Sequence, residues 1–157
     1  MQDRQAKVIR EQLAAYAVRG VLRRFEERPG RGGRTEFRFT WLLDRSFLLI
    51  FDPAKSQLVL KDLLLHVAPR SDLDRAIRAF VAGRSDAKLL PHRRIDASRA
   101  VLSCTNRNSR VSFALTVKRN QYKYAVTKLL NFCQELFGHL EKVDIQYMWS
   151  HMGVPEE

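Results

Sequence analysis

Histidine and cysteine side chains are the residues of this chain best suited to metal binding or nucleophilic chemistry. The four histidines are His66, His92, His139 and His151. No two of them stand four residues apart, as the ligands of a helical metal site do. Cys104 and Cys133 form no Cys-x-x-Cys pair. The spacing therefore favours no metal site, and we expect two free thiols inside the fold.

No serine or glycine-rich loop stands in a pattern typical of a catalytic or cofactor site. Ser103 and Cys104 fall in an alternating, strand-like stretch, whereas a serine nucleophile needs a sharp strand-to-helix turn. Residues 30–34, Gly-Arg-Gly-Gly-Arg, lack the Gly-Lys-Ser/Thr ending of a phosphate-binding loop and precede a strand-like stretch. We therefore expect a non-enzymatic protein without a cofactor.

Basic residues are the most prominent chemical feature. The 157-residue chain has 28 Lys and Arg against 17 Asp and Glu, a formal net charge of +11. Eleven basic residues and two acids lie between Arg84 and Lys128, so that stretch carries +9 and the remainder +2. A local excess of this kind is typical of surfaces that bind nucleic acid or another polyanion. The alternative explanation is an arginine-rich composition, because 20 of the 28 are Arg.

Ten residues of this stretch are candidates for binding a polyanion. Two tyrosines are interleaved with the basic side chains, and tyrosine rings stack on nucleic-acid bases. Cations near the start of a helix oppose its dipole, so helix stability does not explain them. The candidates are Arg93, Arg94, Arg99, Arg107, Arg110, Lys118, Arg119, Tyr122, Lys123 and Tyr124.

Hydrophobic periodicity predicts the elements that position these residues. Apolar residues recur at helical spacing over residues 2–27, with Gly20 at a point of close packing. Residues 35–43, 46–51 and 57–67 are strand-like and are joined by short turns, which predicts an antiparallel meander. Ser71 is then expected to cap a second helix, with Gly83 as a left-handed residue past its end.

The second half of the chain predicts a hairpin and a long helix. Strands are expected at residues 95–105 and 110–118, joined by a turn at residues 106–109. The final helix is expected from Tyr122 to near Met152, and its apolar residues cover more of its circumference than one sheet face needs. That surplus indicates either a self-association surface or additional core packing. The self-association candidates are Phe132, Phe137, Leu140, Tyr147, Met148 and Trp149.

Together these elements predict one α+β domain over residues 1–157. The expected order is helix, three-strand antiparallel meander, helix, β-hairpin and long C-terminal helix, with the helices packed on an antiparallel sheet. This order resembles the type III secretion chaperone-like fold from about Gln2 to Met152. The resemblance implies a small homodimer that presents a sheet-and-helix surface to a partner polypeptide. Secretion chaperones are typically acidic, so this basic chain departs from them in charge.

Two functions follow from these observations. The first is a binding or adaptor module, a homodimer that engages another polypeptide. The alternative is binding of nucleic acid or another polyanion through the segment from Arg84 to Lys128. No apolar run approaches the roughly 18 residues of a membrane span, and the first residues lack the apolar core of a signal peptide. We therefore expect a cytoplasmic protein with no membrane partner.

Overall fold

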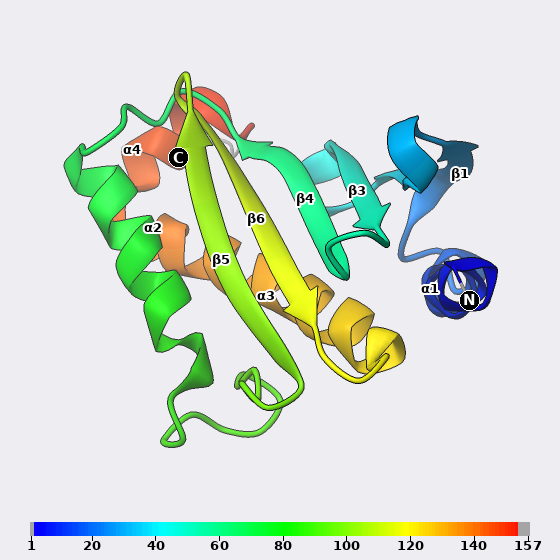
Figure 1. Ribbon diagram of the computed structural model, residues 1–157. Coiled ribbons are helices and arrows are strands. Elements are labelled where there is room, and N and C mark those ends of the chain that lie inside the picture. The colour runs from blue at the N-terminus through cyan, green and yellow to red at the C-terminus, as the bar shows by residue number, and fades with distance from the viewer. Residues whose placement is uncertain (1, 154–157) are drawn as a thin grey trace.

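The computed structural model describes residues 2–153 and has an α+β architecture in which helices pack on a six-stranded antiparallel sheet (Figure 1). The strands are β1 (Arg23–Pro29), β2 (Thr35–Thr40), β3 (Ser46–Asp52), β4 (Gln57–Leu64), β5 (Ala100–Arg107) and β6 (Arg110–Val117). The helices of this part of the chain are α1 (Gln2–Val18), α2 (Asp72–Ala82), α3 (Tyr122–Val143) and α4 (Ile145–His151). The predicted fold class is confirmed.

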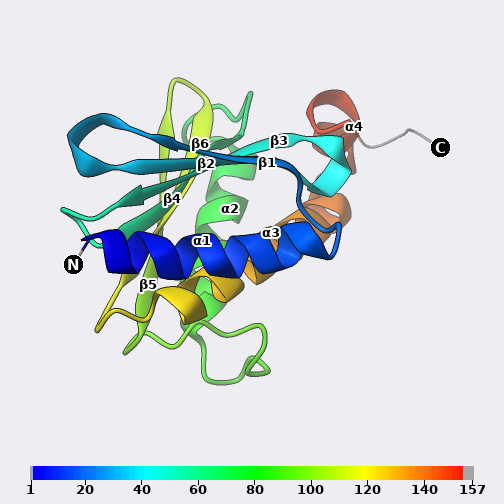
Figure 2. The same ribbon diagram turned by 90° about the vertical axis from the view of Figure 1, so that its right-hand side faces the viewer.

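The sheet has the strand order β1-β2-β3-β4-β6-β5. Short turns connect β1, β2, β3 and β4 in succession. Helix α2 then connects β4 to the β5–β6 hairpin, and β6 pairs with β4. Strand residues alternate between two faces, so pairs such as Phe37 with Leu49 and Leu60 with Phe113 point into the core. In Figure 1, α3 lies behind β4 and β6 and α2 lies beside β5, and Figure 2 shows α1 running alongside β1 and β2; no helix of the described chain covers the opposite face.

The N-terminal helix is shorter than predicted. It ends at Val18, because Gly20 adopts a left-handed φ of 77°. The N–H of Gly20 donates a hydrogen bond to the carbonyl of Ala17 at 3.0 Å. Gly20 has no close neighbour, so the packing explanation for it is wrong. The following residues form β1, a strand absent from the predicted order. As an edge strand β1 is almost entirely charged and needs no alternating pattern; its Phe25 alone packs inward, on Phe37.

Two other boundaries differ from prediction for local reasons. The last helix breaks at Asp144, whose side chain accepts a hydrogen bond from the N–H of Tyr147 at 3.1 Å and so begins α4. Gly83 follows α2 with a φ of −83° and is not left-handed. The predicted cap at the other end of α2 is confirmed, since the Ser71 hydroxyl accepts from the N–H of Asp74 at 3.1 Å.

Five of the six self-association candidates lie in the core of this chain. Phe132, Phe137, Leu140, Tyr147 and Met148 are buried, and Trp149 alone is partly exposed. Phe132 packs between Phe113 and Phe80, and Phe137 packs on Phe47. The apolar surplus of α3 is needed because the helix contacts α1 and α4 as well as the sheet. The expectation that these five side chains form an external surface is therefore corrected.

Candidate anion-binding site

The polyanion-binding candidates lie at opposite ends of the β5–β6 hairpin. Arg107 and Arg110 pair across its tip, and Asn108 and Ser109 form a two-residue turn with positive φ. Lys118 follows the other end, where Ala100 pairs with Val117. Each strand is seven residue steps long from its first to its last residue, which is about 23 Å at the usual rise per residue of a β-strand. The ten candidates therefore do not form one patch.

Two candidates lie apart from both groups. Tyr122 is only 2% exposed and packs edge-on against Phe51, and burial raises the pKa of its hydroxyl. It cannot stack on an external base. Arg93 pairs with Glu135 of α3 at 3.3 Å, and Arg84 lies near the same carboxylate.

Of the remaining candidates, Arg99 contacts Tyr124 near the beginning of α3, Lys123 lines the hollow beside it, and Lys118 donates to the carbonyl of Ala97. The guanidinium carbon of Arg99 lies 3.6 Å from the centroid of the Tyr124 ring, and Lys128 Nζ lies 5.5 Å from it. Arg99 also donates from Nε and Nη2 to the side-chain oxygen of Gln121, at 3.2 and 2.8 Å. We call Arg94, Arg99, Tyr124 and Lys128 the Tyr124 cluster. Stacking and hydrogen bonding hold Arg99 in one position before any ligand arrives.

The electrostatics of the Tyr124 cluster are those of unpaired cations. Burial lowers the pKa of Lys128, and the nearby charges of Arg94 and Arg99 lower it further. Within residues 2–153, no carboxylate lies within 4 Å of the charged groups of these three side chains. Asp96 does act on Arg94 and Arg99, but its carboxylate accepts hydrogen bonds from the backbone and hydroxyl of Ser98. A bound anion would relieve the repulsion among the three cations.

The N-terminus of α3 adds to this positive field. Gln121 precedes the helix without capping it, because its side-chain oxygen is engaged by Arg99. The first helical hydrogen bond runs from the N–H of Ala125 to the carbonyl of Gln121 at 2.9 Å. The first N–H groups of a helix have no partner within it, and with the helix dipole they favour a negative charge.

Beside the cluster is an open hollow of about 500 Å³ between α1 and α3. Two hydrogen bonds hold the helices together here, from Gln5 to Asn120 at 2.6 Å and from Gln12 to Thr127 at 2.9 Å. No acid is among its lining residues, which are Val8, Arg99, Asn120, Gln121, Lys123, Tyr124, Thr127 and Lys128. The geometry suits an anionic group seated against an apolar wall.

Sequence reasoning missed some residues of this site. Lys128 was within the basic stretch but was not among the ten candidates, although it stands four residues after Tyr124 and so shares its helix face. That spacing was the available signal. Gln121 and Val8 had none, because their roles depend on contacts with Arg99 and on the packing of α1 against α3.

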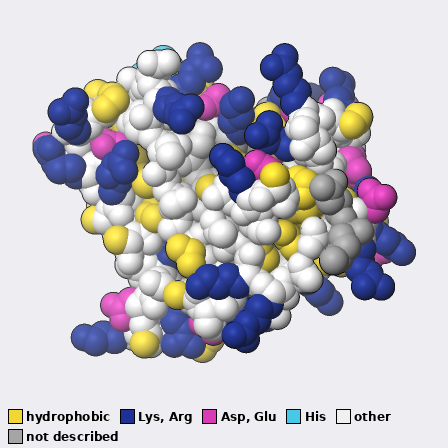
Figure 3. Space-filling model, viewed as in Figure 1, with side chains coloured by type: hydrophobic (Ala, Val, Ile, Leu, Met, Phe, Trp, Pro, Cys, Tyr) yellow, Lys and Arg dark blue, Asp and Glu magenta, His cyan; other side chains and the backbone are white. Residues whose placement is uncertain are grey.

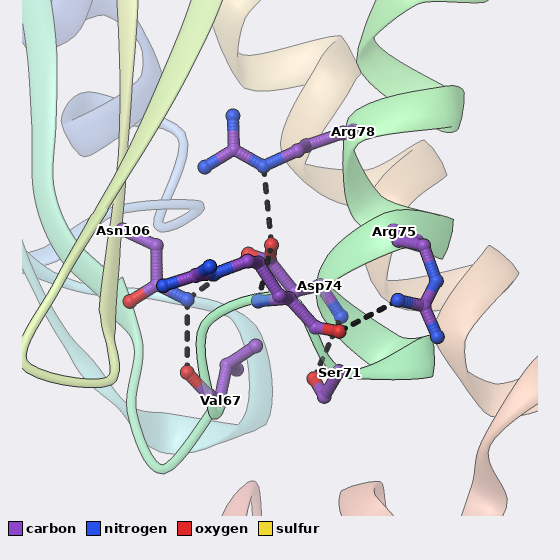
Figure 4. Close-up of polar contacts among 7 residues, drawn as sticks. Val67, Ser71, Asp74, Arg75, Arg78 and Asn106 are labelled. Atoms are coloured by element: carbon purple, nitrogen blue, oxygen red, sulfur yellow. Dashed lines mark hydrogen bonds and ion pairs between the residues drawn. The ribbon is translucent and has the colours of Figure 1, made fainter.

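A second polar network, around Asp74, is structural in character (Figure 4). Asp74 is 4% exposed and accepts hydrogen bonds from Asn106 Nδ2, the N–H of Arg70 and Arg78 Nε, at 3.0 to 3.1 Å. Asn106 also donates to the carbonyl of Val67 at 2.8 Å. These bonds tie the start of α2 to β5. Nearby, burial raises the pKa of the Cys104 thiol, so its environment is not that of an activated nucleophile.

The described residues contain no group of three or more His, Cys, Asp and Glu side chains suited to holding a metal ion. Among the helices of residues 2–153, none has the length and apolar character needed to cross a membrane. No model of a known protein family matches the chain, and no similar chain was found among curated proteins or solved structures.

Proposed function

We propose that the protein binds polyanions, with nucleic acid as the ligand class, through the Tyr124 cluster. One observation carries this proposal: Arg99 and Lys128 lie at the ring of Tyr124, the charge of Arg94 acts on Lys128, and none of the three has a carboxylate within 4 Å in the described chain. Some other basic side chains of this protein are instead paired with an acid. Arg10, Arg23 and Arg78, for example, each pair with a carboxylate.

The energetic basis is counterion release. A basic side chain that neutralises a nucleic-acid phosphate frees a condensed cation, and affinity then falls steeply as salt rises. Arg99 is suited to this role because Tyr124 and Gln121 already immobilise it, so little conformational entropy is lost on binding. Lys128 and Arg94 supply further charge without a fixed orientation toward an acid.

The test is salt-dependent binding of a labelled single-stranded oligonucleotide by the double variant Arg99→Gln, Lys128→Gln. Two lost phosphate contacts should reduce the salt slope by about 1.4 and weaken binding roughly tenfold near ~0.15 M salt. The control is Lys142→Gln combined with Arg38→Gln, which removes equal charge from exposed sites elsewhere that are in no ion pair among residues 2–153. Lys142 is on the same helix, about 21 Å from Lys128 at the helical rise.

Binding by the double variant with an unchanged slope would overturn the assignment to this cluster. A wild-type protein without affinity for the strand would overturn the function. Arg99→Lys provides a further check, because it keeps the charge but loses the double hydrogen bond to Gln121. We expect it to bind more weakly than wild type with a nearly unchanged salt slope.

A second candidate is the homodimeric adaptor, supported by the edge strand β5. Its eight residues pair regularly with β6 and contain no bulge or proline, and β5 has no strand on its other side. Helix α2 packs on β5, and a regular edge that stays accessible beside it can pair with a second copy or with another polypeptide. Val101 on this strand is 43% exposed.

A further inference from the structure

The face of the sheet opposite the helices is hollowed as well as uncovered. A hollow of about 640 Å³ lies over it, a volume typical of ligand sites. Figure 3 shows this face, with Lys and Arg side chains gathered toward its upper and lower margins and a largely white middle. Residues of β3, β4, β5 and β6 form its floor: Ile50, Gln57, Val59, Thr105 and Ser112. We call this hollow the sheet groove.

The basic residues of the sheet groove lie at its two ends. Lys55 is in the β3–β4 turn, and the loop carrying Arg31 and Arg34 lies beside it because Thr35 pairs with Phe51. At the other end, Arg107 and Arg110 pair across the hairpin tip beside Lys61 of β4. Lys61 lies four residues after Gln57, the first residue of β4, and Lys55 lies in the turn before it, so the ends are more than about 13 Å apart.

The acids of the groove are largely occupied. Asp52 is buried and pairs with Arg34 at 3.3 Å, and Asp62 pairs with Arg110 at 3.7 Å. Glu36, the third acid of the lining, lies beside the backbone of Gly30. Four basic side chains of the lining then have no carboxylate within 4 Å among residues 2–153: Arg31, Lys55, Lys61 and Arg107. The groove therefore presents two free cations at each end.

We propose that the sheet groove binds an extended single strand of nucleic acid, whose phosphates contact both basic ends. The proposal rests on the proposed function for its ligand class. A single phosphate group cannot reach both ends, whereas a short strand can: about six nucleotides suffice even at the stacked rise of ~3.4 Å per nucleotide, and an extended strand needs fewer. The floor between the ends offers hydroxyl and amide groups beside aliphatic carbons and has no aromatic ring. The contact is therefore to the sugar-phosphate backbone, with little preference for sequence.

The groove and the Tyr124 cluster are separate surfaces. The cluster borders a hollow between two helices, whereas every residue that lines the groove belongs to a strand or a strand-connecting loop. Each surface can therefore be removed without altering the other.

The experiment measures affinity for single strands of about two to ten nucleotides, the shorter end of the site sizes that single-strand binders show. It uses Arg99→Gln, Lys128→Gln as the background so that the cluster does not contribute. The affinity should rise with length and flatten at or below about six nucleotides, where both ends are spanned. Lys61→Gln with Arg107→Gln removes one end, and Arg31→Gln with Lys55→Gln removes the other. Either pair should weaken binding of the longer strands roughly tenfold near ~0.15 M salt and flatten the length dependence.

Arg38→Gln combined with Lys142→Gln is the matched control, because it also removes two positive charges from exposed positions. Arg38 is an exposed base whose pairing with Leu48 places it on the same face as Ile50, but it does not line the groove. Groove variants that bind like this control, with the length dependence intact, would overturn the groove while leaving the cluster in place. Loss of binding in the groove variants with no effect of the cluster substitutions would support the groove and overturn the cluster assignment. If an acidic peptide of equal length competes as strongly as the oligonucleotide, the assigned ligand class is wrong.

Discussion

Replacing Asp74 by alanine should be among the most destabilising single substitutions on the surface layer of this protein. Asp74 has the chemistry of a surface residue but is 4% exposed, and three donors converge on its carboxylate. Two of them come from outside α2: the N–H of Arg70, just before the helix, and the side chain of Asn106 on β5. The Asp74 carboxylate thus joins segments that are 32 residues apart in sequence.

The size of the effect follows from these contacts. A hydrogen bond to a charged group contributes about 1.5–3 kcal/mol, and a buried donor left without a partner costs about 1–3 kcal/mol. Arg78 is half-exposed and regains water, and Asn106 keeps its bond to Val67. The Arg70 and Asn106 donors then account for a loss of about 3 kcal/mol. For a protein of this length that corresponds to a fall of roughly 6–12 °C in Tm.

Thermal unfolding measures the effect, and Asp72→Ala is its control. Asp72 lies two residues earlier, its side chain is 99% exposed, and it pairs with Arg75 alone, so its loss should change stability by less than about 0.5 kcal/mol. Equal melting temperatures for the two variants would refute the structural role of Asp74. Asp74→Asn should lie between them, because the amide keeps one acceptor oxygen.

The pH dependence of this effect has a defined sign. Burial raises the pKa of Asp74, but hydrogen bonds from Asn106, the backbone of Arg70 and Arg78 outweigh it, and the net pKa is below the ordinary 3.8. A carboxylate with a lowered folded-state pKa stabilises the fold above its unfolded-state pKa and loses that contribution as pH falls through the folded value. The stability difference between wild type and Asp74→Ala should be constant above about pH 5 and shrink below about pH 4.

Two further substitutions test the end of helix α1 and the edge strand β5. Gly20→Ala should lower stability by about 1 kcal/mol in thermal unfolding, because alanine is strained at a φ of 77° although nothing crowds the position; an unchanged Tm would contradict the role of Gly20 as the terminator of α1. If β5 pairs with a second copy, sedimentation should give twice the monomer mass of 18.3 kDa, and Val101→Lys should restore the monomer. A monomeric wild type at micromolar concentration would exclude that dimer.

The parts of the fold that sequence predicted are those where one face of an element is buried. The alternation of Phe37 and Phe39 with charged neighbours predicts a strand with one buried face. The structure has strand β2 at these residues, with both phenylalanines buried. The Ser71 cap was predictable because a serine oxygen and the N–H three residues later satisfy each other locally. Strand β1 was not predictable in this way, since an edge strand with one inward side chain has no period to detect.

The candidate site was predictable in composition but not in geometry. The stretch from Arg84 to Lys128 contains the Tyr124 cluster, yet it also contains Arg107 and Arg110 at the far end of the hairpin. Charge counted along a chain does not distinguish these arrangements. The pairing of β5 with β6 holds Arg107 and Arg110 away from Lys118, and the packing of α3 brings Tyr124 and Lys128 to Arg99.

The same reasoning explains why the sheet groove was not visible in the sequence. Outside the basic stretch the chain has a balance of only +2, which suggests that its charges cancel. In the folded protein many of the acids there are already engaged: Asp52 with Arg34, Asp44 with Arg23 and Glu27 with Arg10. Each of these acids forms an ion pair with a nearby arginine. Arg31 and Lys55 then have no acidic partner within 4 Å in the described chain, on the face of the sheet that no helix covers. A nearly neutral segment can therefore contribute one end of a basic groove, because the electrostatic field of a surface depends on which charges remain unpaired on it.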